Sequence, residues 1–396
     1  MMNQNRLKIY NGKLITPYKT IEQGTLLVEN GKIVGLEEGN AEFPDAHEID
    51  AQGNYIAPGF IDLHIHGGGG HDFMDNTVEA FLGIAEIHAR YGTTAMCPTT
   101  LTSEKEDLME TLRIYEQADK LNNKGAQFIG MHLEGPYFAL SQRGAQDPRY
   151  IRDPDPAEYK EILAATSIVK RWSAAPELKG AIEFGRYLKS KGILPAIAHT
   201  DAIYEEVLEA FENGYTLATH FYSGMSGVTR RDCFRFAGVI ESGYLIDEMD
   251  VEIIADGVHL PAPLLKLIYK IKGASRTALI TDAMRGAGMP PGESILGSRK
   301  NGLPVIIEDG VAKLPDRTSF AGSVATADRL LRNMVNMAGV SLEEAVRMMT
   351  KTPARIMGLD ERKGALTVGK DADVVVFDQQ ICIQYTIVNG KVVYSS

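Results

Sequence analysis

Cysteine and long apolar runs are scarce in this chain. It has three cysteines, Cys97, Cys233 and Cys382, which are too widely spaced to form a disulfide framework and suggest a reducing compartment. No apolar run approaches the roughly 20 residues that a membrane-spanning helix needs. The opening stretch, MMNQNRLKIYNGKL, contains no apolar segment of the kind that a signal peptide needs. We therefore expect a cytoplasmic protein.

Basic residues are fewer than acidic ones. The chain has 41 lysines and arginines against 52 aspartates and glutamates, which gives a net charge of −11. Such a surface repels nucleic acid and anionic membranes, so neither is expected as a partner. A small anionic substrate would need a local basic pocket. With 396 residues, 44% of them hydrophobic, the chain is expected to form one large globular domain and one small one.

The two ends of the chain have the same β-rich character. The first fifty-odd residues and the last thirty read as short strands separated by glycine turns. Asn-Gly pairs, which favour tight hairpins, occur at 11–12, 30–31 and 389–390. We therefore expect residues 1–56 and 361–396 to form one small β-sandwich domain.

The middle of the chain alternates between β-prone runs and segments of helical period. This order is typical of a parallel sheet covered by helices, and the number of strand candidates is the number that a closed (β/α)8 barrel of the TIM type requires. Such a barrel is expected over residues 57–360. The strand candidates are 54–66, 93–100, 128–135, 167–177, 193–200, 215–222, 251–259 and 277–284.

Polar side chains gather at the carboxyl ends of these strand candidates, where barrel enzymes build their active sites. In GFIDLHIH, His64 and His66 project from the same face of a strand, and two neighbouring imidazoles can hold a divalent metal ion. The alternative is a pair of hydrogen-bonded core histidines. The other strand ends favour the metal site, because they add more side chains of the kinds that bind metals. The residues at the ends are His64, His66, Thr99, Glu134, Glu177, His199, His220, His259 and Asp282.

Several motifs together resemble a known family. PGFIDLHIHG, HLEGPY, AHTDA, THFYSGM, IADGVH, TDAMRGAG and GALTVGKDADVVVFD occur in this order along almost the whole chain. They are similar to the N-acetylglucosamine-6-phosphate deacetylases of the amidohydrolase superfamily. The resemblance implies a metal-dependent hydrolase that removes the N-acetyl group from N-acetylglucosamine 6-phosphate in amino-sugar metabolism, with glucosamine 6-phosphate and acetate as products.

The same resemblance implies the roles of the polar strand ends. Glu134, His199 and His220 match the family's principal metal ligands, and His64 and His66 match a pair that some members use for a second ion. Asp282 matches the catalytic acid and base. The expected cofactor is one or two divalent ions, with zinc first and iron, manganese or cobalt as alternatives.

The resemblance also implies substrate contacts and a partner. Ser223 and Gly224 stand where many members have an Asn-Ala pair. Of Arg230, Arg231 and Arg235, the spacing from His220 favours Arg231 as the phosphate ligand, and the alternative is that all three are ordinary solvated charges. In the family this arginine can cross a dimer interface, so a homodimer is expected. The other implied substrate contacts are Ala145, Gln146, Asp256, His259, Phe320, Ala321 and Gly322.

Other functions and roles stay open. The chain could be another amidohydrolase, such as an N-acetylgalactosamine-6-phosphate deacetylase or a cyclic-amide hydrolase, or a non-catalytic barrel. Lys170 lies too early in its strand to act as the carboxylated bridging lysine of cyclic-amide hydrolases. His132 is expected to be a hydrogen-bonded core residue, Glu177 to form a structural salt bridge, and His88 to lie on the surface or on a helix.

Overall fold

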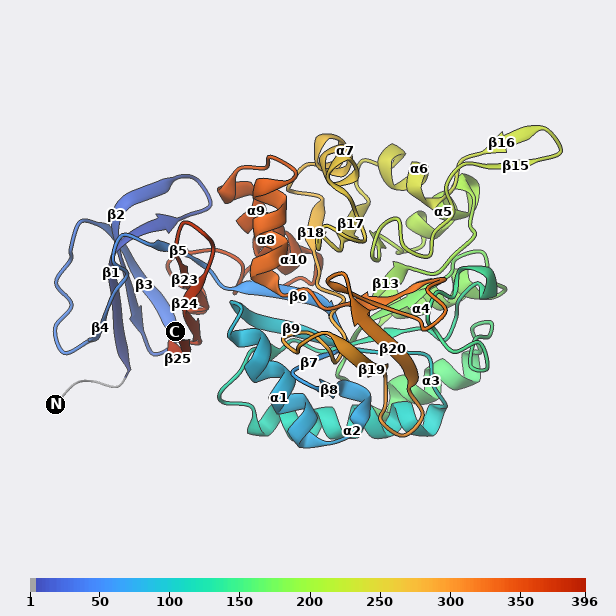
Figure 1. The fold of residues 1–396 in the computed structure, drawn as a ribbon, viewed down its shortest axis with the longest axis horizontal. Helices are drawn as coiled ribbons and strands as arrows, with labels where there is room; N and C mark the ends of the chain where they lie inside the picture. Colours follow the sequence, from blue (N-terminus) through green and yellow to red (C-terminus); the bar gives the residue numbers. More distant parts are fainter. Residues whose placement is uncertain (1–4) are drawn as a thin grey trace.

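The computed structural model describes residues 5–396, and its two chain ends meet in one sheet beside the main body (Figure 1). The sheet order is β25-β24-β23-β5-β1-β2-β3, with β4 beside β1. Leu26 and Val374, from the two ends of the chain, belong to one hydrophobic core. The strands are β1 (Arg6–Ile15), β2 (Thr20–Glu29), β3 (Lys32–Glu38), β4 (His47–Asp50), β5 (Tyr55–Pro58), β23 (Val374–Phe377), β24 (Ile383–Val388) and β25 (Lys391–Ser395).

Two of the Asn-Gly pairs form the predicted hairpin turns, and the third does not. Residues 30–31 and 389–390 have positive φ and join β2 to β3 and β24 to β25. Asn11 instead lies inside β1 with φ of 56°, at a break in the register between β1 and β2. This pair is therefore a bulge. The proposed domain limits, 1–56 with 361–396 and 57–360, stay a prediction, and residues 1–4 lie outside the described residues.

The predicted barrel is present. Its parallel strands follow the chain order β6-β9-β11-β12-β13-β14-β17-β18. The ring closes where Asp282 N donates to His64 O at 2.9 Å and His66 N donates to Ala283 O at 2.8 Å. Every residue of β6 and β9 is buried, as expected for parallel strands that are covered on both faces. The strands are β6 (Phe60–Ile65), β9 (Thr93–Thr100), β11 (Met131–Glu134), β12 (Val169–Ala174), β13 (Leu194–Ile197), β14 (Leu217–Ala218), β17 (Asp250–Ile253) and β18 (Thr277–Leu279).

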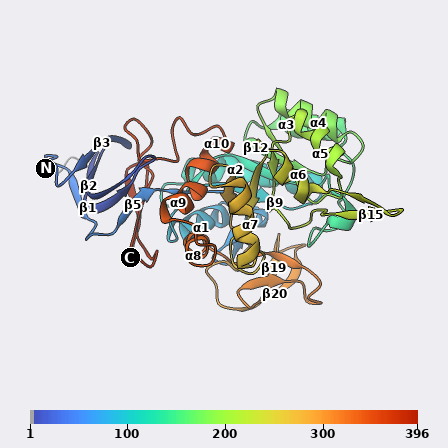
Figure 2. The same cartoon turned by 90° about the horizontal axis from the view of Figure 1, so that it is seen from above.

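Helices surround the barrel (Figures 1 and 2). They turn apolar faces inward, as α1 does with Phe81 and Ile84. Thr77 caps the start of α1 by accepting a hydrogen bond from Ala80 N. Among residues 5–396 no helix is long and apolar enough to cross a membrane. The helices are α1 (Val78–Ala89), α2 (Lys105–Leu121), α3 (Pro156–Ala165), α4 (Ala181–Ser190), α5 (Tyr204–Glu212), α6 (Val239–Leu245), α7 (Ala262–Lys272), α8 (Ala327–Asn336), α9 (Leu342–Met349), α10 (Lys351–Ile356), and the 3-10 turns η1 (Phe73–Asp75) and η2 (Leu140–Gln142).

An antiparallel sheet that the sequence analysis did not predict follows the last barrel strand. We call it the insert sheet, and it stands out from the helices in Figure 2. A bridge between Ala283 and Ser323 joins it to the rim of the barrel. Met284, Val305 and Ala321 pack together beneath it. Its strands are β19 (Gly292–Leu296), β20 (Leu303–Glu308), β21 (Val311–Lys313) and β22 (Phe320–Ser323).

A second hairpin projects from the body. Strands β15 (Thr229–Arg231) and β16 (Phe234–Phe236) form an arm at the upper right of Figure 1, which also extends outward in Figure 2. We call residues 229–236 the arginine arm. The short pair β7 (Gly67–Gly68) and β8 (His71–Asp72), together with β10 (Gln127–Phe128), completes the strands of the described chain.

Candidate active site

The polar strand ends converge at one rim of the barrel. His64 is the penultimate residue of β6, and Glu134 is the last residue of β11. His199, His220 and Asp282 follow β13, β14 and β18 by two or three residues. Parallel strands end at the same side of a barrel, so side chains that are distant in the sequence meet there.

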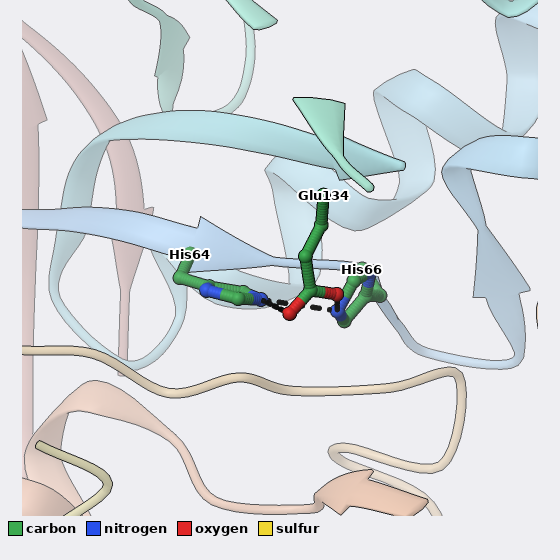
Figure 3. Close-up of side chains that lie close together, drawn as sticks. All are labelled: His64, His66 and Glu134. Carbon is green, nitrogen blue, oxygen red and sulfur yellow. Dashed lines mark hydrogen bonds and ion pairs between the residues drawn. The ribbon is translucent and has the colours of Figure 1, made fainter. Parts of the chain in front are cut away.

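Glu134 lies at the centre of this group. Its Oε1 is 2.9 Å from His220 Nε2 and 3.3 Å from His199 Nε2. Its carboxylate also lies between His64 of β6 and His66 just after that strand, with Oε1 3.5 Å from His64 Nε2 and Oε2 3.4 Å from His66 Nε2 (Figure 3). Within residues 5–396, two groups have ligand atoms close enough to hold a metal ion, Glu134-His199-His220 and His64-His66-Glu134. Glu134 is common to both.

The ring nitrogens of these histidines fit a bound cation. Nδ1 of His66, His199 and His220 lies 3.2, 2.7 and 3.1 Å from the carbonyl oxygens of Thr99, Gln142 and Ser223. A carbonyl oxygen can only accept, so each Nδ1 carries a proton. Nε2 can then present a lone pair to a bound ion, or, when it is protonated, donate to a neighbouring carboxylate. Nε2 of His66 is also only 3.2 Å from Nε2 of His64. Metal-binding histidines are commonly oriented in this way by a hydrogen bond from the other nitrogen.

The backbone at three of these residues adopts the left-handed conformation. The φ angles of His199, His220 and Asp282 are 48°, 33° and 47°. Such angles are uncommon for residues other than glycine, and histidine and aspartate tolerate them better than most. Each of the three lies just past its strand. The left-handed backbone conformation of these three residues therefore helps to set the direction of their side chains at the rim.

The two carboxylates at the rim are ionised despite their burial. Burial alone would raise the pKa of Glu134, but the electrostatic effect of His64 and hydrogen bonds with His199 and His220 bring this pKa well below its usual value. Burial likewise opposes the charge on Asp282, and the electrostatic effect of His64 and a hydrogen bond with His66 lower the pKa of its carboxyl. Its Oδ1 is 3.2 Å from His66 Nε2 and 3.5 Å from His64 Nε2. Asp282 is therefore a proton acceptor beside the candidate metal ligands.

A pocket of about 500 Å³ opens above this group. Most of the predicted substrate contacts line it together with His66, Glu134, His199, His220 and Asp282. They are Ala145, Gln146, Ser223, Gly224, His259, Phe320 and Gly322.

Gln146 lines the pocket but has its own partners. Its Nε2 donates to Glu134 Oε2 at 2.7 Å, and its Oε1 accepts from Thr102 N and Oγ1 at 2.8 and 2.9 Å. The amide therefore orients Glu134.

Gly224 lines the pocket at a position where a side chain would clash. A Cβ on Gly224 would lie 2.8 Å from His199 Nδ1, and its φ of 58° also favours glycine. The backbone and packing of this chain therefore favour glycine at position 224.

Three predicted substrate contacts do not line the pocket of their own chain. Arg231 is exposed on the arginine arm, with its guanidinium 5.4 Å from the Phe236 ring centre. The side chain of Ala321 packs beneath the insert sheet. Asp256 is buried and bonds His259, whose Nδ1 donates to Asp256 Oδ2 at 2.8 Å. Burial opposes the charge on Asp256, but this hydrogen bond lowers the pKa of its carboxyl.

Several pocket residues were not predicted from the sequence, most of them on or beside the insert sheet. No local motif distinguished these positions, and the loop between β21 and β22, which carries three of them, comes close to the metal ligands only through the packing of the insert sheet. The missed residues are Leu101, Gly144, Tyr222, Leu296, Lys313, Arg317, Thr318 and Ser319.

The remaining expectations have mixed outcomes. His132 is a buried hydrogen-bonded residue as predicted, with Nε2 2.7 Å from Ser173 Oγ. Glu177 makes no salt bridge within residues 5–396. It accepts hydrogen bonds from Thr200 Oγ1 and Asp201 N, both at 2.6 Å. Lys170 is exposed, so no lysine of this strand reaches the metal ligands. His88 lies on α1, but it is buried.

Comparisons with known proteins agree with this geometry. The amidohydrolase family matches residues 55–393. The chain is 33% identical to an N-acetylglucosamine-6-phosphate deacetylase of Lysinibacillus sphaericus, over 94% of this chain and 93% of that protein. It is 32% identical to an N-acetylgalactosamine-6-phosphate deacetylase of Escherichia coli, over 96% and 97%.

A similar solved structure is a mutant N-acetyl-D-glucosamine-6-phosphate deacetylase from Mycobacterium smegmatis in complex with N-acetyl-D-glucosamine-6-phosphate. It superposes with a TM-score of 0.90 at 28% identity, over 99% of this chain and all of that one. These matches cover nearly the whole chain. It belongs to the amidohydrolase family and groups within it with the N-acetyl amino-sugar 6-phosphate deacetylases.

Proposed function

We propose that this chain hydrolyses the N-acetyl group of N-acetylglucosamine 6-phosphate to glucosamine 6-phosphate and acetate, a step of amino-sugar metabolism. The observation that carries the proposal is the meeting of Glu134, His199 and His220 with Asp282 in one pocket. The similar deacetylases support the choice of substrate.

The donor set fits a divalent ion. Glu134, His199 and His220 would hold one ion, and His64 and His66 would hold a second with Glu134 shared. Imidazole and carboxylate ligands suit zinc, and iron, manganese and cobalt accept the same atoms, so zinc is proposed first. A bound ion lowers the pKa of a water molecule toward about 7 and polarises an amide carbonyl.

Asp282 would move the proton in this reaction. Its carboxylate takes a proton from the attacking water as the new C–O bond forms at the acetyl carbon. It then gives that proton to the sugar nitrogen as the C–N bond breaks, because an amide anion is too basic to leave unprotonated. Nδ1 of His259 donates its hydrogen bond to Asp256, so Nε2 is available to orient a sugar hydroxyl.

The galactosamine epimer is the second candidate substrate. The relative from Escherichia coli acts on N-acetylgalactosamine 6-phosphate by name and is similar to this chain to almost the same degree. Ser223 and Gly224, which depart from the family pattern, line the pocket. The two epimers differ at one hydroxyl group, which a few pocket contacts can distinguish.

An acetate-release assay combined with elemental analysis of the purified protein tests this function. We expect one or two equivalents of divalent metal and acetate release from one or both sugar phosphates. The panel should contain both epimers, and cyclic amides scored for ring opening. Metal-replete protein that releases no acetate from either epimer would refute the deacetylase assignment, and ring opening would support the cyclic-amide alternative.

We also infer that the protein is a homodimer. Arg231 and Phe234 are exposed at the tip of the arginine arm, with 73% of Phe234 accessible. Because Arg231 does not line the pocket of its own chain, a role in phosphate binding requires it to reach the pocket of a second copy. An arm that inserts into a partner would also cover Phe234.

A further inference from the structure

The last residue of β21 and the loop that joins it to β22 carry polar side chains into the pocket. Lys313, Arg317, Thr318 and Ser319 all line it. The loop also approaches the metal ligands. A Cβ built on Gly144 would lie 3.6 Å from His199 Cε1 and 3.9 Å from Ser319 Oγ. One small side chain would therefore span the gap, and the loop and the ligand His199 face the same space.

Lys313 and Arg317 each form an ion pair with an acidic residue that does not line the pocket. Lys313 Nζ lies 2.6 Å from Asp309 Oδ2, and Arg317 Nε lies 2.9 Å from Glu308 Oε1. The two cations line the pocket, whereas Glu308 and Asp309 do not. The acidic partners therefore support the cations from the side away from the pocket. Among the lining residues of the described chain, Lys313 and Arg317 are the only lysine and arginine.

Arg317 keeps donors free for a ligand. Its Nε and Nη2 bond Glu308, and Nη1 bonds Pro315 O. A guanidinium has five N–H groups, so two remain without a partner within residues 5–396. The floor of the pocket carries the charges of Glu134 and Asp282, which would repel a phosphate. An anionic substrate therefore needs positive charge elsewhere in the pocket.

We propose that Lys313 and Arg317 bind the phosphate group of the substrate in the pocket of their own chain, beside the metal ligands and Asp282. This inference rests on the proposed function and adds a specificity-determining site to it. Arginine offers a planar pair of donors that matches two phosphate oxygens, and lysine adds a point charge. The site selects phosphorylated sugars over neutral ones.

The test compares ligands with and without phosphate. Lys313→Gln, Arg317→Gln and the double variant are assayed on N-acetylglucosamine 6-phosphate and on N-acetylglucosamine. Binding of glucosamine 6-phosphate and of glucosamine to the metal-loaded protein is measured by calorimetry. Each single variant is expected to raise KM for the phosphorylated substrate and Kd for glucosamine 6-phosphate about tenfold, since a charge-assisted hydrogen bond is lost. The values for the unphosphorylated sugars are expected to stay unchanged.

Two further variants separate phosphate binding from a structural role. Lys300→Gln removes a cation of the same insert that lies outside the pocket, and it is expected to change neither constant. Glu308→Gln removes an acidic partner of Arg317 and of Lys313, which lies 3.4 Å from Glu308 Oε1, but leaves both cations, so phosphate affinity is expected to hold or to improve. If Glu308→Gln weakened binding as much as Arg317→Gln, the loop would need the ion pair itself, and the proposal would be wrong.

The test of the phosphate site does not depend on whether the wild-type protein is an active deacetylase. Equal losses for phosphorylated and unphosphorylated sugars, or no loss in the double variant, overturn the phosphate site even if the wild type is an active deacetylase. If the wild type released no acetate, a selective loss of glucosamine 6-phosphate binding in the double variant would still support the site. Failure of the proposed function and failure of this inference are therefore distinguishable.

Discussion

The histidines of the candidate metal centre are oriented before any ligand binds. Nδ1 of His66, His199 and His220 each faces a backbone carbonyl oxygen, which leaves Nε2 as the atom that faces Glu134. Such hydrogen bonds restrict the tautomer and the ring orientation. The centre therefore depends on loop carbonyls as well as on the ligands themselves.

Replacement of Asp282 by asparagine tests the proton-transfer role. The amide has nearly the same shape but cannot take up the proton, so Asp282→Asn is expected to lower kcat about 100-fold or more. Steady-state acetate release measures the change. Metal content and the unfolding transition should stay near those of the wild type, because the variant leaves Glu134, His199 and His220 in place. A kcat within a few-fold of the wild type would contradict the role.

Replacement of Glu134 by alanine tests the ligand assignment. Glu134 belongs to both groups that could hold an ion, so Glu134→Ala is expected to lower the metal content of both. Elemental analysis after dialysis measures it. Glu177→Gln is the matched control, because Glu177 follows the barrel strand β12 by three residues and accepts hydrogen bonds from Thr200 and Asp201 instead. Full occupancy in Glu134→Ala, or equal metal loss in the control, would show that this carboxylate does not hold the ion.

Barrel strands and the connections between them differ in how well local sequence predicts them. Each predicted strand candidate overlaps a barrel strand, because buried parallel strands appear as continuous apolar runs, and only β17 begins outside its candidate, one residue earlier. The insert sheet was missed, and Asn11-Gly12 was taken for a turn although it is a bulge. An Asn-Gly pair indicates only positive φ. Whether the chain then reverses depends on neighbouring strands, which here continue on both sides of Asn11.

The contact between α1 and β7 predicts a pH dependence of stability. His88 is fully buried on α1, and its Nε2 donates to Gly67 O at 2.9 Å. Burial lowers the pKa of His88 from 6.5 to about 4, although the bond to Gly67 opposes this shift. The unfolded chain therefore takes up a proton at a higher pH than the folded one.

The corresponding measurement compares wild type with His88→Gln. The contribution of His88 is fully present above pH 6.5 and is lost as the pH falls toward about 4, which amounts to ~3 kcal/mol. Denaturant unfolding at pH 7.5 and at pH 4.5 should therefore show a larger loss for the wild type than for His88→Gln, which does not titrate. Parallel losses in both proteins would show that His88 does not titrate on unfolding.

The whole molecule consists of the barrel, a sheet formed by both ends of the chain, the insert sheet and the exposed arginine arm. The pocket of one chain contains the proposed metal ligands and Asp282, but Arg231 lies on the arm outside it. If the arginine arm reaches the pocket of a partner, one chain supplies the metal ligands and Asp282 of that pocket and the other chain supplies Arg231. This arrangement predicts complementation between variants.

Mixing two defective variants tests the homodimer. Asp282→Asn lacks the proton acceptor, and Arg231→Gln lacks the arm guanidinium. In a hybrid dimer, the pocket of the Arg231→Gln chain keeps Asp282 and receives Arg231 from the other chain, so one pocket is restored. Acetate release after joint refolding is expected to exceed the sum of the separate variants. Mixed Asp282→Asn and Glu134→Ala chains are the control, because both defects lie within the pocket of their own chain. Light scattering that shows only monomers would contradict the proposed dimer.

The local pattern of apolar and polar residues was sufficient to predict the barrel and its polar rim. Apolar runs predict buried strands, and parallel strands that end at one side bring His64, His66, Glu134, His199, His220 and Asp282 together. The family motifs suggested their roles. Packing between distant segments decided the rest. Lys313 and Arg317 reach the pocket because the insert sheet folds over the rim, Gln146 turns to Glu134, and Arg231 projects away. These placements depend on contacts between residues that are far apart in the sequence, and the hydrophobic periodicity of a single segment does not predict such contacts.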